Sequence, residues 1–190
     1  MHKIAVFASG MGSNAQKLID NFRRHHSIKI ELIVSNKADA GVLNIAKNEK
    51  IETLLLDKEK FFRGNSYIDE LKDRGINFIV LAGFLWKIPS ALVKSFPNKI
   101  INIHPALLPA YGGKGMYGSF VHEAVIKAGE VETGITIHYV DDQYDHGPII
   151  FQARLSIDKN DTPQTIAHKI HQLEHDNYPR VVEEVVSRQV

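Results

Sequence analysis

The sequence predicts an α/β fold: a mainly parallel, twisted sheet of about seven strands, with helices on both faces and an antiparallel strand pair near the carboxyl terminus. The first observation is that short β-branched runs alternate with longer segments whose apolar residues recur at helical spacing, a pattern typical of βαβ units. The second is that only eight residues join the last two runs, which is too short for a parallel crossover. Together these observations indicate a Rossmann-like architecture.

Five strand candidates occupy the first part of the chain, and each is short and apolar. They cover residues 3–8, 28–34, 52–56, 77–82 and 99–103. Between them, apolar residues recur at the spacing of one helix face. These helix candidates cover residues 14–26, 40–50, 66–75 and 89–96. Because a helix-length segment separates neighbouring strands, we expect these strands to run parallel.

The second part of the chain has shorter connections. A glycine-rich loop at 104–118 precedes a helix candidate at 120–130. Two strand candidates follow at 134–140 and 149–157. Their short connection makes them the predicted antiparallel pair.

One long helix ends the predicted order of elements. It begins with Asp161 or Thr162 as its N-cap and ends near Ser187, with Pro179 as a candidate break. No linker-like stretch divides the chain, and its length suits one domain. We therefore expect a single domain over residues 1–190.

The amino-acid composition excludes several kinds of binding partner and chemistry. The chain carries 23 basic and 22 acidic residues, so it lacks the positive charge of a nucleic-acid-binding protein. It has no cysteine, which excludes disulfides, zinc–cysteine clusters and thiol chemistry. No stretch is long and apolar enough to span a membrane, and the amino terminus lacks a leader-like cleavage site. We therefore expect a cytoplasmic protein that binds small molecules.

A glycine-rich turn follows the first strand candidate. Gly10 and Gly12 precede Ser13 and Asn14, which are good helix caps, so the backbone amides from Gly12 onward would face an anion at a helix N-terminus. The run also fits the G-x-G-x-x-A pattern of dinucleotide sites, but the second strand ends in “IVSN” and offers no acidic residue for a ribose diol. A single phosphate fits the turn better, and a tight turn without a ligand is the alternative.

Two polar side chains interrupt the fifth strand candidate. Asn102 and His104 are two residues apart, so they share one face near its carboxyl end. Asp145 precedes a tight Gly-Pro turn near the carboxyl end of strand 134–140, which would bring its carboxylate beside His104. We expect this carboxylate to favour the imidazolium form of His104, and partial burial to raise the pKa of Asp145.

These three groups suit one type of reaction. The Asn102 amide can donate to an oxygen that becomes negative, while His104 and Asp145 can move protons. None of the three is expected to act as a nucleophile that forms a covalent intermediate. We therefore expect acyl transfer by direct attack of a substrate amine.

Other histidines are interpreted as structural. His168, His171 and His175 share one face of the last helix, as metal ligands would, but no carboxylate signature converges with them. A solvated or packed helix face explains them better, and we predict no metal site. His122 and His138 are likewise given no functional role.

Four ordered motifs carry a resemblance that covers nearly the whole chain. They are “GMGSN” at 10–14, “AGFLWKI” at 82–88, “NIHPALLP” at 102–109 and “GITIHYVDDQYDHGPII” at 134–150. The chain resembles the formyltransferase family that uses 10-formyltetrahydrofolate, and within it the phosphoribosylglycinamide formyltransferases of purine synthesis. The resemblance implies transfer of a formyl group to the amino group of glycinamide ribonucleotide. A formyltetrahydrofolate hydrolase, another formyltransferase of the family and a Rossmann-type nucleotide-binding module are the alternatives.

The resemblance also implies catalytic roles. Asn102 would bind the formyl oxygen and stabilise the tetrahedral oxyanion. His104 would lie beside the reacting carbon, and Asp145 would orient His104 and a water that relays the proton of the attacking amine. The folate is the implied co-substrate, and no metal is implied.

Substrate contacts are implied on both sides of these groups. The residues that would hold the ribonucleotide phosphate through backbone amides are Gly12, Ser13 and Asn14. Glu174 would hydrogen-bond the ribose, and Arg63 is the nearest counterpart of an arginine that binds phosphate in the family. The residues that would surround the folate pteridine are Leu85, Ile88, Val140 and Asp141.

Overall fold

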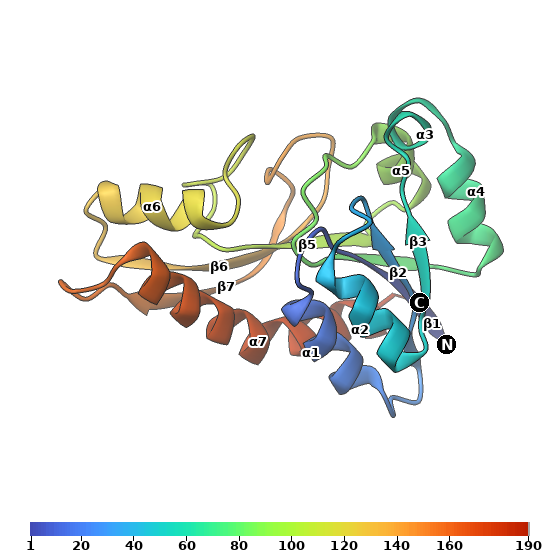
Figure 1. The fold of residues 1–190 in the computed structure, drawn as a ribbon, viewed down its shortest axis with the longest axis horizontal. Coiled ribbons are helices and arrows are strands. Elements are labelled where there is room, and N and C mark those ends of the chain that lie inside the picture. The colour runs from blue at the N-terminus through green and yellow to red at the C-terminus, as the bar shows by residue number, and fades with distance from the viewer. Residues whose placement is uncertain (190) are drawn as a thin grey trace.

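The computed structural model describes residues 1–189, in which seven strands form one sheet with helices around it (Figure 1). The strand order across the sheet is β3-β2-β1-β4-β5-β6-β7. The strands are β1 (His2–Phe7), β2 (Ile28–Ser35), β3 (Glu52–Leu55), β4 (Phe78–Leu81), β5 (Ile100–His104), β6 (Glu132–Tyr139) and β7 (Ile149–Ser156). The predicted fold class, a mainly parallel sheet with an antiparallel pair at the end, is confirmed.

The sheet changes direction at its sixth strand. β1 to β5 pair in parallel with one another, and the predicted antiparallel pairing of β6 with β7 is present. β6 is also antiparallel to β5, which the sequence analysis did not predict because nothing within β5 specifies the direction of its neighbour. As a result, Asn102 of β5 lies directly opposite His138 of β6.

Helices cover both faces of the sheet, as predicted. They are α1 (Ser13–Phe22), α2 (Gly41–Glu49), α3 (Lys58–Arg63), α4 (Ser66–Asp73), α5 (Ser90–Ser95), α6 (Ser119–Lys127) and α7 (Pro163–Ser187). Figure 1 shows α1, α2 and α7 on one side of the sheet and α3, α4 and α5 on the other. Apolar residues of the first group pack on the face that carries Ile4 and Val6, while those of the second group pack with Ala5 and Phe7 on the other face. This division follows from strand geometry, because successive side chains point to opposite faces.

Two helices differ from the prediction. α3 was not expected, because it is short and mostly charged; the Asp57 side chain starts it by accepting a hydrogen bond from the Lys60 amide, and Phe61 anchors it in the core. α7 continues through Pro179, although proline removes a helical hydrogen bond. Pro179 and its neighbour Tyr178 are buried against the sheet, so packing holds the helix together there.

The long last helix starts at one of its two predicted caps. Thr162 is the N-cap: its hydroxyl accepts a hydrogen bond from the Thr165 amide, and the Thr165 hydroxyl accepts one from the Thr162 amide. This reciprocal pair satisfies two amides that the helix itself leaves free. Within residues 1–189, no helix has both the length and the apolar character needed to cross a membrane.

Candidate active site

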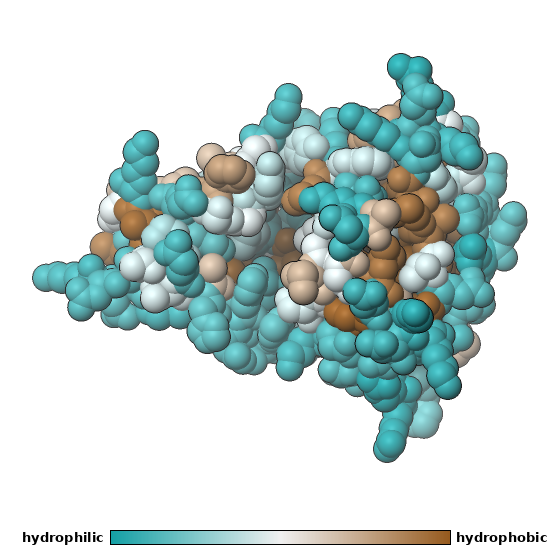
Figure 2. Space-filling model, in the orientation of Figure 1, coloured by the Kyte–Doolittle hydropathy of each residue, from teal (hydrophilic) through white to brown (hydrophobic). Residues whose placement is uncertain are grey.

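A cleft of about 600 Å³ opens beyond the carboxyl ends of β1, β4 and β5, the edge where ligands bind in open α/β sheets. The surface is hollowed there, between α6 and the body of the sheet (Figure 2). The cleft brings together most of the predicted site residues, which come from five separate segments of the chain. Those that line it are Gly12, Ser13, Asn14, Leu85, Asn102, His104, Asp145 and Glu174.

The turn after β1 is shaped to receive an anion. Gly12 has a φ of 85°, and a Cβ there would lie 2.8 Å from the Val42 side chain, so this position needs glycine. α1 begins at Ser13 with no side-chain cap on its first amides and no acidic residue in its first turn. These amides are therefore available to an anionic ligand at the positive end of the helix dipole.

Asn14 connects this turn to the last helix. Its Nδ2 atom donates a 2.8 Å hydrogen bond to Oε2 of Glu174, a residue that is 5% exposed. Burial raises the pKa of Glu174 to about 7, although the bond from Asn14 acts in the opposite direction. Below neutral pH the Glu174 carboxyl is therefore mainly protonated, and it can then donate a hydrogen bond as well as accept one.

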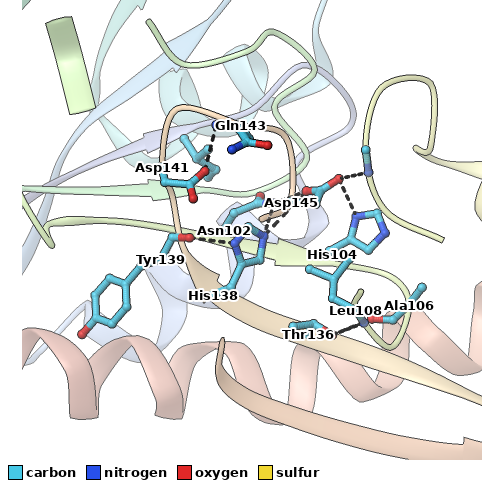
Figure 3. Close-up of polar contacts among 12 residues, drawn as sticks. Asn102, His104, Ala106, Leu108, Thr136, His138, Tyr139, Asp141, Gln143 and Asp145 are labelled. Carbon is cyan, nitrogen blue, oxygen red and sulfur yellow. Dashed lines mark hydrogen bonds and ion pairs between the residues drawn. The ribbon is translucent and has the colours of Figure 1, made fainter. Parts of the chain in front are cut away.

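The register of β5 and β6 adds a histidine that the sequence analysis left without a role. His138 is 2% exposed, and its Nε2 atom lies 3.1 Å from Nδ2 of Asn102 (Figure 3). His138 Nδ1 donates a 2.8 Å hydrogen bond to the Tyr139 carbonyl, so Nε2 is left to accept from the amide of Asn102. His138 thereby fixes which way the Asn102 amide points. The local signal was Thr136 and His138 on one strand face, but only the register reveals the contact.

Asp145 lies at the centre of this cluster. Its Oδ1 accepts a 3.4 Å bond from Asn102 Nδ2, and its Oδ2 accepts a 3.0 Å bond from the Gly113 amide. His104 Nδ1 and His138 Nε2 each lie 3.6 Å from one of its oxygens. Burial on its own would raise the pKa of Asp145, but His138, His104 and the Gly113 amide together hold that pKa below its ordinary value. Asp145 is therefore a carboxylate at neutral pH.

A backbone carbonyl, rather than Asp145, holds the ring of His104. This residue is 3% exposed, and its Nε2 donates a 2.7 Å hydrogen bond to the Tyr111 carbonyl. Burial lowers the pKa of His104, and the nearby carboxylate of Asp145 offsets this effect only in part. As expected from the sequence, Asp145 favours the imidazolium form of His104 and burial acts to raise the pKa of Asp145, but other effects together outweigh both, so each net pKa shift is downward. At neutral pH His104 is uncharged, and its Nδ1 is an acceptor that faces Asp145.

This arrangement can take up a proton at one point and stabilise an oxygen at another. Nδ1 of His104 and Oδ2 of Asp145 are two acceptors 3.6 Å apart, so an amine or a water that contacts both can lose a proton there. Asn102 holds Asp145 by its longer hydrogen bond of 3.4 Å, which an incoming carbonyl oxygen can replace. Attack of an amine on an acyl carbon requires both functions.

Two predicted contacts lie away from the cleft. Arg63 is exposed on α3, where it pairs with Glu59 over 3.3 Å. Ile88 is 3% exposed and packs in the apolar cluster beneath α3, α4 and α5. Both residues line a second pocket of about 390 Å³ instead of the first.

The loop after β6 enters the cleft later in its sequence than predicted. Val140 packs against the apolar cluster of the α3–α5 face, and Asp141 bonds His146 over 2.7 Å. Tyr144 and Asp145 of the same loop line the cleft. Of the predicted folate contacts, Leu85 is the one that lines it.

The histidines of α7 do not form a ligand set. His171 and His175 stack with their ring planes nearly parallel and their centroids 6.4 Å apart. Across residues 1–189, no group of three or more histidine, aspartate or glutamate side chains is placed to hold a metal ion.

Comparison with known proteins relates the whole chain to one family. The formyl transferase family matches residues 2–182. Phosphoribosylglycinamide formyltransferase of Bacillus subtilis is 36% identical over 191 residues, which are 98% of this chain and 95% of that protein. The chloroplastic phosphoribosylglycinamide formyltransferase of Arabidopsis thaliana is 41% identical over 187 residues, or 95% of this chain. The chain spans 64% of the Arabidopsis relative and 62% of a second plant relative, from Vigna unguiculata.

Solved structures share the fold. Phosphoribosylglycinamide formyltransferase from Bacillus halodurans superimposes with a TM-score of 0.88 at 34% identity, over 99% of this chain and 97% of that one. Glycinamide ribonucleotide transformylase 1 from Symbiobacterium toebii gives a TM-score of 0.89 at 29% identity, over 100% and 90% of the two chains. The resemblance read from the four motifs is confirmed: this chain belongs to the formyl transferase family, and it groups with the phosphoribosylglycinamide formyltransferases.

Proposed function

We propose that this chain transfers the formyl group of 10-formyltetrahydrofolate to the amino group of glycinamide ribonucleotide, a step of purine synthesis. The observation that carries the proposal is that one cleft joins the anion-binding turn at Gly12 to the cluster of Asn102, His104 and Asp145. A phosphorylated amine requires the first feature, and acyl transfer requires the second. Membership of the formyl transferase family supports the choice of donor and acceptor.

In this proposal the ribonucleotide amine attacks the formyl carbon directly. As the new C–N bond forms, the formyl oxygen becomes negative and accepts a hydrogen bond from the Asn102 amide. The nitrogen then loses a proton to His104 Nδ1 or the Asp145 carboxylate, the two acceptors that lie 3.6 Å apart. Collapse of the tetrahedral intermediate breaks the bond between the formyl carbon and the folate nitrogen, which takes up a proton as it leaves.

The same cleft suggests where each substrate lies. The phosphate occupies the amides at the turn, those of Gly12, Ser13 and Asn14. The ribose lies near Glu174, which is hydrogen-bonded to Asn14. The folate enters on the side of Leu85, which is 36% exposed. We do not assign phosphate binding to Arg63, because it lines the second pocket.

Two alternative functions would require only part of the cleft. A formyltetrahydrofolate hydrolase would use water as the nucleophile and would leave the anion-binding turn without a function. A dinucleotide-binding module would require an acidic residue after β2, where Asn36 stands instead and bonds Ser9. Formyl transfer to a phosphorylated amine uses both ends of the cleft, and is favoured for that reason.

The proposed function is tested by comparing the amounts of the two products. Purified protein is mixed with 10-formyltetrahydrofolate, with and without glycinamide ribonucleotide, and both deformylated folate and formylated ribonucleotide are measured. The proposal predicts that deformylation requires the ribonucleotide and yields formylated product in equal amount. Deformylation at the same rate without the ribonucleotide would indicate a hydrolase, and no deformylation in either mixture would contradict the proposal.

We also propose that residues 1–190 act as one formyltransferase domain in the cytoplasm. The single sheet and the family match over residues 2–182 support one domain. The absence of cysteine from the sequence agrees with a reducing compartment. Two plant relatives are chloroplastic, so cell fractionation is the test: recovery of the chain in the cytosolic fraction is expected, and recovery in an organelle would contradict it.

A further inference from the structure

One buried hydroxyl ties together the ends of three neighbouring strands. Ser9 follows β1, which lies between β2 and β4 in the sheet, and it is 4% exposed. Its Oγ donates a 2.6 Å hydrogen bond to Oδ1 of Asn36, just beyond β2. The same Oγ accepts a 2.9 Å hydrogen bond from the backbone amide of Leu85, beyond β4. Ser9 therefore bridges two loops that belong to different strands.

The hydroxyl extends the backbone pairing of β1 and β4 past the end of the sheet. The Ala82 amide donates to the Phe7 carbonyl over 2.8 Å, and the Ser9 amide donates to the Gly83 carbonyl over 3.0 Å. The Leu85 amide then bonds the Ser9 side chain instead of a backbone carbonyl. This last link fixes the path of residues 83–85 relative to the turn that follows Ser9.

The segment that follows Ser9 and the segment that its hydroxyl bonds at Leu85 both line the cleft. These segments are Gly10 to Asn14 and Gly83 to Leu85. According to the proposed function, the first segment holds the ribonucleotide phosphate and the second faces the folate. We propose that Ser9 is a positioning residue that sets the Leu85 wall through its amide, and thereby couples the binding of the two substrates; this inference rests on the proposed function.

The burial of Ser9 makes this link difficult to replace. When a buried hydrogen-bonding partner is removed, the group left behind loses its bond and water does not compensate fully. In a Ser9→Ala variant, both the Leu85 amide and the Asn36 side chain lose their bond to Oγ. The wall at Leu85 can then shift away from the turn, and a ligand on one side no longer favours the conformation that the other ligand needs.

Calorimetric titration measures this coupling directly. Tetrahydrofolate is titrated into wild-type protein and the Ser9→Ala variant, with and without saturating ribose 5-phosphate. In the wild type, we expect ribose 5-phosphate to strengthen tetrahydrofolate binding at least about fivefold, the lower end of typical couplings. In Ser9→Ala, we expect tetrahydrofolate affinity to fall about tenfold and the coupling factor to approach one. Affinity for ribose 5-phosphate should change less than about threefold, because the Gly12 amides remain in place.

Ser35→Ala is the matched control. Ser35 is also a fully buried serine at a strand end, but its hydroxyl bonds only the backbone of Lys37, at 3.2 Å to both the amide and the carbonyl. This variant should lose stability without losing coupling. At Asn36, the Asn36→Asp variant keeps an acceptor for Ser9 and should retain coupling, whereas Asn36→Ala should lose part of it. These two variants carry the test if Ser9→Ala does not fold.

Two results would overturn the positioning role. One is wild-type coupling in Ser9→Ala, or in Asn36→Ala if Ser9→Ala does not fold. The other is an equal loss of coupling in Ser35→Ala, which would reduce Ser9 to a contributor to general stability. A wild-type protein that transfers formyl groups but shows no coupling would contradict this inference and leave the proposed function intact. Coupled binding without any formyl transfer would support the role of Ser9 and contradict the proposed function.

Discussion

The two ends of the cleft are built by different means. At the β1 end, backbone amides that follow Gly12 offer an anion site, and the turn that presents them is specified by adjacent residues. At the β5 end, a network of side chains spans antiparallel strands: Asn102 bonds His138, which is 36 residues away in sequence. The first end depends on local backbone geometry, and the second depends on the register of strands that are distant in the chain.

Because the two ends of the cleft are built differently, we expect them to have separate functions in binding and in chemistry. A fixed set of amides binds a phosphate in the ground state and the transition state alike, so damage there should raise a KM and leave kcat nearly unchanged. The β5 network contains the proton acceptors and the oxyanion donor, so damage there should lower kcat. The variants that follow test whether the two ends divide binding from chemistry in this way.

The largest effect is expected from the β5 network itself. Asn102→Ala, His104→Ala and Asp145→Asn should each lower kcat for formyl transfer by at least about a hundredfold, the scale of a positioned proton or oxyanion group. Steady-state kinetics with circular dichroism would separate lost chemistry from lost folding. His146→Ala is the control, because this exposed neighbour of Asp145 bonds Asp141 and should keep wild-type rates. Wild-type kcat in Asp145→Asn would contradict the proton-transfer role.

At the other end, Gly12→Ala should raise the KM for the ribonucleotide about tenfold or more while kcat changes little. A Cβ at this position meets Val42 at 2.8 Å and requires a positive φ, so the turn must distort. Gly129→Ala is the matched control, since Gly129 also has a positive φ, of 70°, but nothing lies within 4 Å of its Cβ position. The control should lose stability with no change in KM. An equal KM rise in both variants would show that the anion-binding turn has no special role.

A smaller effect is expected at His138. Removal of its ring in His138→Ala frees the Asn102 amide to rotate, so kcat should fall about tenfold while both KM values stay close to wild type. His138→Gln offers an oxygen that can accept from Asn102, and should recover much of the rate. If the glutamine variant is as slow as the alanine variant, His138 does more than orient Asn102.

The smallest effect is on stability and concerns Glu174. Its pKa in the folded chain is raised by burial from 4.5 to about 7, so between these pH values the folded chain holds a proton that the unfolded chain has released. Stability is therefore lost as pH rises through this window. Glu174→Gln removes the titration, so its Tm relative to wild type should increase by several degrees between pH 4.5 and 7 and stay level outside that range. Glu123→Gln, at an exposed position of α6, should show no such trend.

The sequence was most informative where structure is set locally. Strand and helix periodicity located six of the seven helices and all the strands, because the apolar faces of these elements pack in the core. The turn at Gly12 was predictable because glycine readily takes the positive φ that this turn requires. The pair of Asn102 and His104 was visible because their two-residue spacing on a strand puts both side chains on one face.

What the sequence could not show depends on contacts between distant segments. The role of His138 follows from the antiparallel register of β5 and β6, which no local pattern encodes. The net pKa shifts of His104 and Asp145 could not be predicted because they depend on how deeply His104 is buried and on the groups that surround Asp145, which are His138, His104 and the Gly113 amide. Gly113 belongs to the glycine-rich loop, whose path the sequence pattern does not specify.

In the proposed reaction the bound ribonucleotide itself attacks the formyl carbon, and no formyl group is attached to the protein on the way. The most direct measurement uses 10-formyltetrahydrofolate labelled in the formyl carbon, mixed with the protein and quenched in acid, with and without glycinamide ribonucleotide. Direct transfer predicts no label on the precipitated protein in either mixture, and full recovery of the transferred label in the ribonucleotide. Label that appears on the protein alone and then moves to added ribonucleotide would contradict it.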